Sequence, residues 1–402
     1  MLHGTERSPK SDRQSDKCGN WRNTLKLYEI LRHCRPMLAV LVATVLAMAL
    51  ASPAVAQHYV QENLVSDLAT PVGGAPKIID PNLINPWGVS TSSTSPFWVS
   101  NQGTGTATLY SVNGTTGAVS KVPLVVSIPA SLIGAPTGPT GQVFNPTAHF
   151  VVSSGTSTGP ALFIFAALNG TISGWNPNVP PPPPSKIAQL GVKGAPAPVV
   201  YTGLAMAMRG TDPFLYAANA AADRVDVFDK NYTQVSLPGS FHDPTLPAGD
   251  TPFNIVNVGG QLFVTYEGPT GVVNIFDTDG NFLKRFTTGG TLINPWGIAL
   301  APAKFGKFSN ALLIGNFNNS RTAPNGPGWI SGFNPHTGEF RGLLEDRGRP
   351  ITIDALWSLK FGNGGNGGIP NVLYFSSGMG SAPGVDLEKH GLFGSFTWQP
   401  PN

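Results

Sequence analysis

The side chains of this chain that could do chemistry are amides, a few acids and one imidazole, and they gather where repeated segments open. The hexapeptide LINPWG at 83–88 returns unchanged at 292–297. Six units of roughly 40–60 residues open on a short apolar segment, often entered through Asn-Pro. The candidate binding residues at or beside these openings are Asn85, Trp87, His149, Asn254, Asn294, Trp296, Asp354 and Trp357. Their amide and carboxylate oxygens suit calcium or a polar ligand such as a sugar, and indole rings offer flat contact surfaces.

Each candidate also has a structural interpretation, which stays open. An asparagine before proline is first of all a turn residue, whose side chain bonds nearby backbone. The recurrence of tryptophan in the repeats favours packing between units. Asp354 can bond turn amides, and His149 can be a buried, hydrogen-bonded histidine. No residue is assigned a catalytic role.

The pattern of strands predicts the fold. After its opening segment, each unit has a strongly apolar strand and then a third strand in which apolar positions tend to alternate. With 48 glycines and 38 prolines for turns, this predicts an all-β, six-bladed β-propeller. The last unit has only three strands, whereas residues 59–65 form an orphan strand near the start. We expect that N-terminal strand of the mature chain to close the last blade and remove an exposed edge.

A targeting segment precedes the propeller. Residues 37–51 are an apolar run with Arg32 and Arg35 before it and Ala54-Val-Ala56 after it, which predicts a signal peptide cleaved after Ala56. The run is shorter than the roughly 20 residues of a membrane span, although an uncleaved anchor is the alternative. We therefore expect residues 1–56 to be a leader plus signal peptide, residues 57–402 to be a single propeller domain, and the protein to be secreted or periplasmic.

Removing the leader changes the bulk properties of the chain. The leader has eight Lys and Arg against four acids, so the net charge of +3 becomes −1 in the mature chain. No basic surface for nucleic acid is expected, and no membrane span. The two cysteines, Cys18 and Cys34, are also lost, which excludes disulfides and thiolate metal sites from the mature chain. A monomer is expected.

Motifs spread along the mature chain carry a resemblance. They are Asn63-Leu-Val-Ser-Asp67, the two Asn-Pro-Trp-Gly copies, Tyr216-Ala-Ala-Asn, Asp226-Val-Phe-Asp229, Pro252-Phe-Asn-Ile255, Val264-Thr-Tyr266 and His390-Gly-Leu-Phe-Gly-Ser395. With them the chain resembles a family of exported bacterial propeller proteins of uncharacterised function, some with a C-terminal sorting signal. The resemblance implies fold and export but no reaction. The Pro-Trp-Gly-Ile openings are also similar to NHL repeats.

Two functions follow as hypotheses. The first is a non-catalytic module or scaffold that binds a polar ligand, glycan or envelope protein through the loop face around the channel, without a cofactor. The alternative is a calcium-dependent hydrolase or lyase, because the six units are distantly similar to gluconolactonase-type enzymes, whose calcium is held by Glu, Asn and Asp. Since no glutamate opens a unit here, the sequence favours the first hypothesis and leaves enzymatic activity uncertain.

Overall fold

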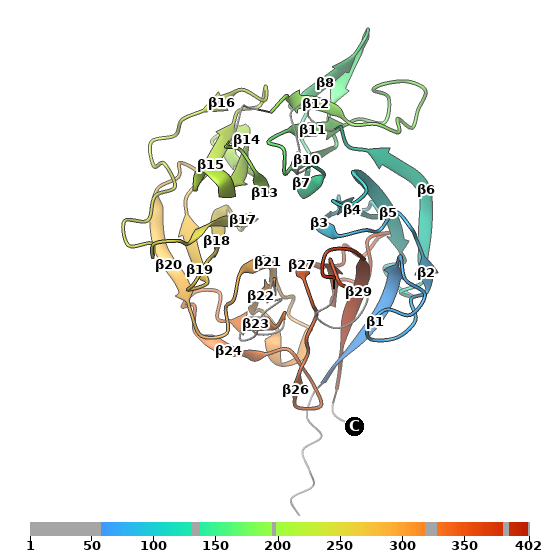
Figure 1. Ribbon diagram of the computed structural model, residues 1–402, viewed down its shortest axis with the longest axis vertical. Coiled ribbons are helices and arrows are strands. Elements are labelled where there is room, and N and C mark those ends of the chain that lie inside the picture. The colour runs from blue at the N-terminus through green and yellow to red at the C-terminus, as the bar shows by residue number, and fades with distance from the viewer. Residues whose placement is uncertain (1–57, 130–136, 195–197, 318–327, 381–385, 401–402) are drawn as a thin grey trace, which may run out of the picture. The chain divides into compact units, whose positions relative to one another are not determined.

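The computed structural model describes residues 58–129, 137–194, 198–317, 328–380 and 386–400. The expected signal peptide and both cysteines lie outside these residues. Within the described residues, six sheets radiate around a centre as the blades of a propeller, which confirms the predicted fold class (Figure 1). No helix in this part of the chain is long and apolar enough to cross a membrane.

In blades one to five the first strand is innermost and the later strands lie successively further out, whereas blade six runs outward from β27 through β28 and β29 to β1 and β2. Blade one contains β3 (Pro86–Ser90), β4 (Phe97–Asn101), β5 (Thr106–Val112) and β6 (Val119–Ser127), and blade two contains β7 (Pro139–Phe144), β10 (Phe163–Ala167), β11 (Ile172–Trp175) and β12 (Gln189–Val192). Blade three contains β13 (Tyr201–Arg209), β14 (Asp212–Asn219), β15 (Arg224–Phe228) and β16 (Gln234–Val235), and blade four contains β17 (Thr251–Val258), β18 (Gln261–Glu267), β19 (Val272–Phe276) and β20 (Phe282–Thr288).

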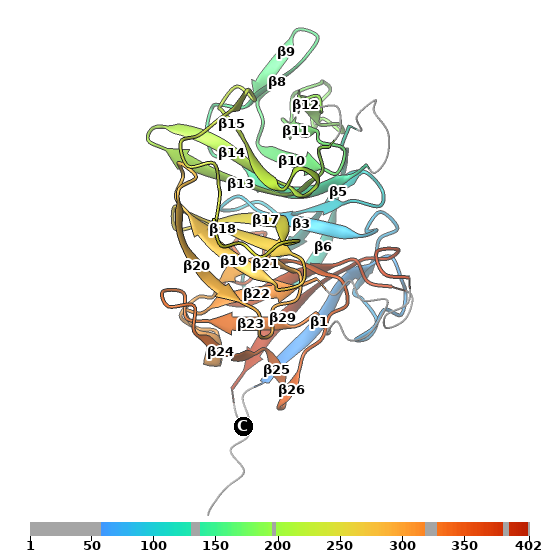
Figure 2. The ribbon, with the colours of Figure 1, turned by 60° about the vertical axis from the view of Figure 1, so that its left-hand side comes forward.

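The last two blades complete the ring. Blade five contains β21 (Pro295–Leu300), β22 (Leu312–Asn316), β23 (Ile330–Phe333) and β24 (Phe340–Leu343), and blade six contains β27 (Leu356–Phe361), β28 (Val372–Ser377), β29 (Leu392–Gln399), β1 (His58–Ser66) and β2 (Ile78–Ile79). Two hairpins, β8–β9 (Val151–Ser154 and Ser157–Pro160) and β25–β26 (Glu345–Asp346 and Arg349–Pro350), lie outside the blades, and the first projects from the ring (Figure 2). Short 3₁₀ turns form at Ala220–Ala222 and Gly306–Phe308.

The chain closes its ring by pairing its two ends. Strand β1 runs antiparallel to β29 from the pair His58–Gln399 to the pair Ser66–Leu392. The side chains of Tyr59, Leu64 and Val65 are buried, and the Tyr59 hydroxyl donates a 2.9 Å hydrogen bond to the carbonyl oxygen of Phe305 in blade five. The predicted closure of the last blade by the N-terminal strand is confirmed.

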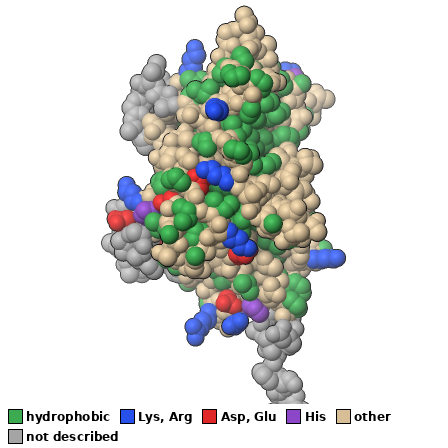
Figure 3. All heavy atoms as spheres, turned by 90° about the vertical axis from the view of Figure 1, so that its right-hand side faces the viewer, with side chains coloured by type: hydrophobic (Ala, Val, Ile, Leu, Met, Phe, Trp, Pro, Cys, Tyr) green, Lys and Arg blue, Asp and Glu red, His purple; other side chains and the backbone are tan. Residues whose placement is uncertain are grey.

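Apolar side chains fill the spaces between neighbouring blades. Separate clusters of buried residues join adjacent sheets, for example Phe263, Val273 and Ile275 of blade four with Ile298 and Ile314 of blade five. Charged side chains are sparse on the outer face that Figure 3 shows, as the low charged fraction of 12% requires. The core is therefore arranged as layers between blades and not as one central mass.

The second unit opens earlier than the sequence pattern predicts. Its inner strand is Pro139–Phe144, and the Asn145-Pro146 pair follows this strand instead of entering it. The Asn145 carboxamide accepts hydrogen bonds from the backbone N–H and the hydroxyl of Thr147, and it donates to the carbonyl oxygen of Ala161. Asn145 is thus a turn residue, and the boundary predicted for unit two is wrong by about one strand.

All six inner strands carry a pairing irregularity at the same level. The register shifts fall in β3 between Pro86 and Val89, and at equivalent places in the other five inner strands. A β-bulge bends a strand and re-aims a side chain. The residue pairs at these bulges are Trp87-Gly88, Thr140-Gly141, Thr202-Gly203, Phe253-Asn254, Trp296-Gly297 and Trp357-Ser358.

The second residue of the pair is glycine in four blades, because the next blade lies against it. A Cβ atom on Gly297 would lie 2.4 Å from the carbonyl oxygen of Trp357, and one on Gly88 would lie 2.5 Å from that of Thr140. Backbone atoms that belong to paired strands cannot move aside cheaply. The Trp-Gly repeat in the sequence therefore marks the places where one inner strand contacts the next.

We expect Gly297→Ala to destabilise the fold by about 3 kcal/mol, the upper end of the range for over-packing. The matched control is Gly210→Ala, because Gly210 has open space around its Cβ position and a φ of +60°. Gly210→Ala should lose only about 1 kcal/mol of unfolding free energy, because its one cost is an alanine in a left-handed backbone conformation. Urea denaturation of both variants checks the difference, and equal losses would contradict the steric explanation.

Candidate functional site

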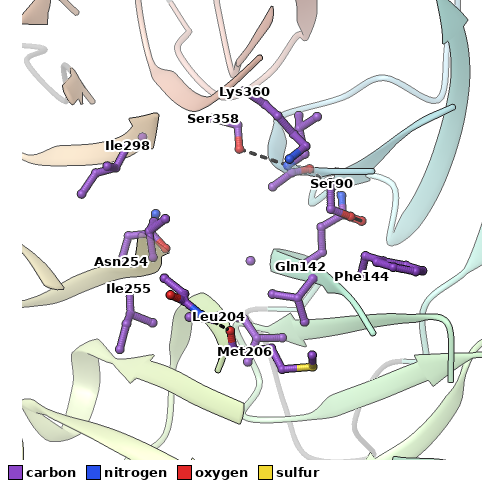
Figure 4. A pocket seen from close by; sticks show the side chains of 18 of the residues that line it. Ser90, Gln142, Phe144, Leu204, Met206, Asn254, Ile255, Ile298, Ser358 and Lys360 are labelled. Carbon is purple, nitrogen blue, oxygen red and sulfur yellow. Dashed lines mark hydrogen bonds between the residues drawn. The ribbon is translucent and has the colours of Figure 1, made fainter. Parts of the chain in front are cut away.

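The inner strands surround a cavity of about 420 Å³ at the centre of the ring (Figure 4). All six of them contribute to its walls, each through the residues that follow its bulge. Its size falls at the lower end of the range for small-molecule sites, roughly 300–1,000 Å³. The arrangement provides one shared space for groups that are far apart in the sequence.

An aromatic plug closes the ring beside this cavity, at the level of the bulges. The plug consists of Trp87, Phe253, Trp296, Phe317 and Trp357, all at most 5% exposed. The rings of Trp87 and Trp357 stack with their centroids 3.5 Å apart, and Phe317 stacks on Trp357 at 4.0 Å. Trp296 meets both tryptophans edge-on. Because Trp296 also lines the cavity, the plug forms part of its wall.

Polar side chains beyond the plug are held in place by hydrogen bonds between blades. The Gln142 amide nitrogen donates to the carbonyl oxygens of Gly88 at 2.6 Å and Trp98 at 2.9 Å, and the Ser90 hydroxyl donates to the Gln142 carbonyl oxygen at 3.1 Å. The Asn254 amide donates to the carbonyl oxygen of Trp296 at 2.8 Å. These bonds fix the side chains without any ligand, which preorganises the site.

The cavity contains a single charged side chain, Lys360 of β27, among the residues that line it. Lys360 is partly buried, and no acidic side chain forms an ion pair with it among the described residues. Burial lowers the pKa of its ammonium group below the usual value. Its cross-strand neighbour Tyr374 stays neutral at ordinary pH, because burial raises the pKa of that phenol to about 12.

The lowered pKa of Lys360 has two expected consequences. After reductive methylation with ¹³C-formaldehyde, the methyl signals of Lys360 should titrate below the usual midpoint of about 10.4. Because the folded state disfavours the charged lysine, this group costs stability below its folded pKa, and the cost disappears as the pH rises towards the unfolded value. Lys360→Met should therefore be more stable than the wild type at pH 7, by about 0.5–2 kcal/mol, with a smaller difference near pH 10.

The signal of Lys360 is assigned by its loss in Lys360→Met, with the exposed Lys186 as the reference in the same spectrum. A midpoint for Lys360 at or above the usual value would contradict the expectation. So would a Lys360→Met variant that loses stability at pH 7.

The structure places the predicted site residues in different surroundings. Asn254 and Trp296 line the cavity, whereas Trp87 and Trp357 are buried in the plug itself. Asn85 and Asn294 precede their inner strands and have φ values of +45° and +48°. Asparagine tolerates this left-handed conformation better than most residues, which explains why it opens these units.

The side chains of Asn85 and Asn294 are engaged in hydrogen bonds. The Asn85 amide donates to Gln102 at 2.8 Å and to Glu388 at 3.3 Å, and its oxygen accepts from the Trp357 indole at 3.0 Å. The Asn294 oxygen accepts from the backbone N–H of Gly268 at 3.1 Å. Both side chains are thus bonded within the protein, although their partners are distant in the sequence and are not the nearby backbone groups that the turn interpretation predicts.

Neither His149 nor Asp354 is among the residues that line the cavity. His149 belongs to the β7–β8 connection, because the inner strand of blade two ends at Phe144. Asp354 lines a second, smaller cavity of about 130 Å³ with Ser377 and Met379, and its carbonyl oxygen accepts a bond from the Ser377 hydroxyl. The structure therefore does not bring all the predicted binding residues together.

Sequence reasoning missed Ser90, Gln142, Ser358 and Lys360. All four follow the bulge of an inner strand by one to three residues, for example Lys360 three residues after Trp357. A signal was present, because the Trp-Gly and Thr-Gly pairs mark the level of the bulge in four units. The residues next along each strand must then line the centre of the ring.

The residues present do not offer an evident place for calcium. No group of three His, Cys, Asp or Glu side chains comes together within the described parts of the chain. The cavity itself is lined by neutral groups and by the cation of Lys360, which would repel a second cation. Calcium prefers several oxygen ligands, usually with carboxylates among them.

Comparison with known proteins identifies relatives in a virus. An uncharacterised protein of Acanthamoeba polyphaga mimivirus is 32% identical over 298 residues, which cover 70% of this chain and 69% of that protein. A second is 30% identical over 296 residues, 70% and 74% of the two chains. The chain belongs to their family. A third mimivirus protein is 26% identical over 257 residues, 56% of this chain and 46% of its own.

No family model matches this chain. Among solved structures, hydrazine synthase of Kuenenia stuttgartiensis matches with a TM-score of 0.45 at 12% identity, covering 73% of this chain and 74% of the other. The Dos1 propeller matches with a TM-score of 0.39 at 12% identity, covering 73% and 70%. Likenesses at this level say nothing about activity.

Proposed function

We propose that this propeller is a binding module that holds a small molecule in its central cavity without catalysis. The observation that carries the proposal is the cavity of about 420 Å³ with contributions from all six inner strands and with one charged side chain, Lys360, among its lining residues. A largely preformed concave pocket with a few convergent polar groups is the usual form of a small-molecule site. Export by the leader and signal peptide of residues 1–56, and hence a secreted or periplasmic location, belongs to the same proposal.

Two features support binding over catalysis. The polar groups Gln142 and Asn254 use their amide nitrogens in bonds to carbonyl oxygens of neighbouring strands, which suits recognition by fixed contacts. Among the described residues that line the cavity, no serine or threonine hydroxyl is hydrogen-bonded to Lys360, the one titratable side chain there, as an activated nucleophile would be. A protein partner or glycan on the loop face is a second mode of binding that the ring architecture would also permit.

A variant that obstructs the mouth of the cavity tests the proposal. Thr91 lines the cavity at the end of β3, and Thr91→Trp places a large ring there. Thr115→Trp, in an exposed turn of blade one, is the matched control. We expect ligand-observed NMR with a mixture of aromatic acids, hexoses and uronic acids to detect a ligand for the wild type and for Thr115→Trp, but not for Thr91→Trp. Equal binding to all three proteins, or to none, would contradict a site in the cavity.

Elemental analysis tests the calcium-dependent alternative. The purified chain from Gln57 is assayed for bound metal, and its melting is followed with and without a chelator. About one equivalent of calcium, lost with a clear fall in melting temperature, would favour a hydrolase or lyase. In that case Asn85, Asn254, Asn294 and Asp354 are the first residues to replace.

A further inference from the structure

We infer that the central cavity takes an amphipathic organic anion, whose charged group pairs with Lys360 and whose apolar body lies against β13, β17 and β21. This inference rests on the proposed binding function and names its ligand class. It depends on three observations: the unpaired cation, the hydrogen-bonding groups beside it, and the uneven distribution of polar and apolar side chains around the cavity.

The cation is the first observation. Lys360 is the one charged side chain in the lining, and no described acid forms an ion pair with it. A partly buried charge without a partner is unfavourable, so a stable fold that keeps one has a use for it. An anionic ligand would supply the missing counter-charge, and because Lys360 is partly buried, salt would screen that attraction less than at an exposed site.

The groups beside Lys360 add hydrogen-bond donors. Ser358 precedes Lys360 by two residues on β27, so both side chains point to the same side of the strand. The Ser358 oxygen accepts a 3.0 Å bond from the backbone N–H of Val89, while its own O–H meets no acceptor among the described residues. An ammonium and a hydroxyl donor side by side suit the oxygens of a carboxylate or a phosphate.

The distribution of side chains around the cavity indicates what the uncharged part of the ligand is. Figure 4 shows Lys360, Ser358, Ser90 and Gln142 on one part of the cavity wall, formed by β27, β3 and β7. Leu204, Met206 and Ile298 line the part formed by β13 and β21, with Ile255 and Asn254 between them on β17. A ligand that satisfied both parts would have an anionic end and an apolar body.

Matched probes test this ligand class by titration calorimetry. Phenylacetate carries both features, phenylacetamide lacks the charge, phenethylamine reverses it, and acetate lacks the apolar body. Phenyl phosphate compares phosphate with carboxylate, and glucuronate replaces the apolar body by a polar one. We expect phenylacetate or phenyl phosphate to bind at least about 30-fold more tightly than phenylacetamide, acetate and glucuronate, and phenethylamine not to bind.

Variants locate the charge. Lys360→Met removes the charge but keeps an unbranched side chain only one atom shorter, and it should weaken phenylacetate binding about 30-fold while leaving phenylacetamide within about twofold. Lys186→Met, at an exposed position, should bind as the wild type does. Phenylacetate should also protect Lys360 of the wild type from an amine-directed labelling reagent. This readout is independent, since it does not depend on the stability of any variant.

The outcomes separate the inference from the function on which it rests. If phenylacetamide binds as tightly as phenylacetate, and Lys360→Met binds both with unchanged affinity, the ligand is not an anion that pairs with Lys360. The small-molecule site itself would stand. Glucuronate binding in preference to phenylacetate would overturn the apolar body. Binding of no probe, or binding that Thr91→Trp does not reduce, would overturn the proposed function and the inference together.

Discussion

A chain that begins at Asp67, and so lacks β1, should lose its cooperative unfolding transition. Removing β1 takes away the buried side chains of Tyr59, Leu64 and Val65 and leaves the edge of β29 unpaired. Burial of each such side chain contributes about 1.5–3 kcal/mol, so the three together approach the whole stability of a typical domain, roughly 5–15 kcal/mol. Thermal melting followed by circular dichroism, with size-exclusion chromatography for aggregation at the open edge, measures the effect.

The control restores the strand as a separate molecule. A peptide of residues 58–66 added to the shortened chain should recover the transition, because strand addition supplies the missing main-chain bonds. The same peptide with Leu64→Asp and Val65→Asp places charges at two buried positions and should not. A shortened chain that melts like the intact protein would show that the closure contributes little.

The closing strand was predictable because it depends on a local pattern and a simple count. Residues 59–65 form an apolar strand with no partner in their own unit, and the last unit ends one strand short. An open blade would expose a hydrogen-bonding edge. Pairing of the two chain ends gives the N-terminal strand a partner and the last blade its missing strand. The second and third strands of each blade were also predictable from local patterns, since the second is a strongly apolar run, apolar positions tend to alternate in the third, and turn residues bound both.

The opening of unit two was not predictable from the same signal. Asn145-Pro146 looks like the Asn-Pro pairs that enter β3 and β21, yet it ends a strand instead of beginning one. Asn-Pro reports a change of chain direction and does not say on which side of the turn the inner strand lies. The bulge position was the better guide, since Thr140-Gly141 has the same form as Thr202-Gly203 in the next blade.

The location of the candidate site at the inner strands was predictable, but most of the residues that line it were not. The expectation that inner strands surround a binding space led to Asn254 and Trp296, which line the cavity. It also led to Trp87 and Trp357, whose side chains the bulges turn into the plug. Regular alternation along a strand gives no warning of such a turn, so sequence reasoning missed Lys360 and Gln142, although the pair Thr140-Gly141 marks the bulge just before Gln142.

Trp357→Ala should be among the most destabilising single substitutions in the chain, because Trp357 stands at the centre of the plug. It stacks on both Trp87 and Phe317, and its indole N–H donates to Asn85 of blade one. Truncating a buried tryptophan to alanine costs about 3–5 kcal/mol. In a domain of this size that corresponds to a fall in melting temperature of roughly 4–7 °C, measured by calorimetry.

Two further variants show which part of the tryptophan matters. Trp357→Phe keeps an aromatic ring but leaves the Asn85 oxygen without that donor, so it should cost only about 1–2 kcal/mol. Trp398→Ala, at a partly buried position on β29, controls for the loss of an indole outside the plug and should cost less than Trp357→Ala. Free indole should restore part of the stability of Trp357→Ala by filling the cavity, as apolar ligands do in engineered apolar cavities. A variant that keeps its melting temperature, or that indole does not stabilise, would mean that the neighbouring rings collapse into the space and that the plug does not depend on its central member.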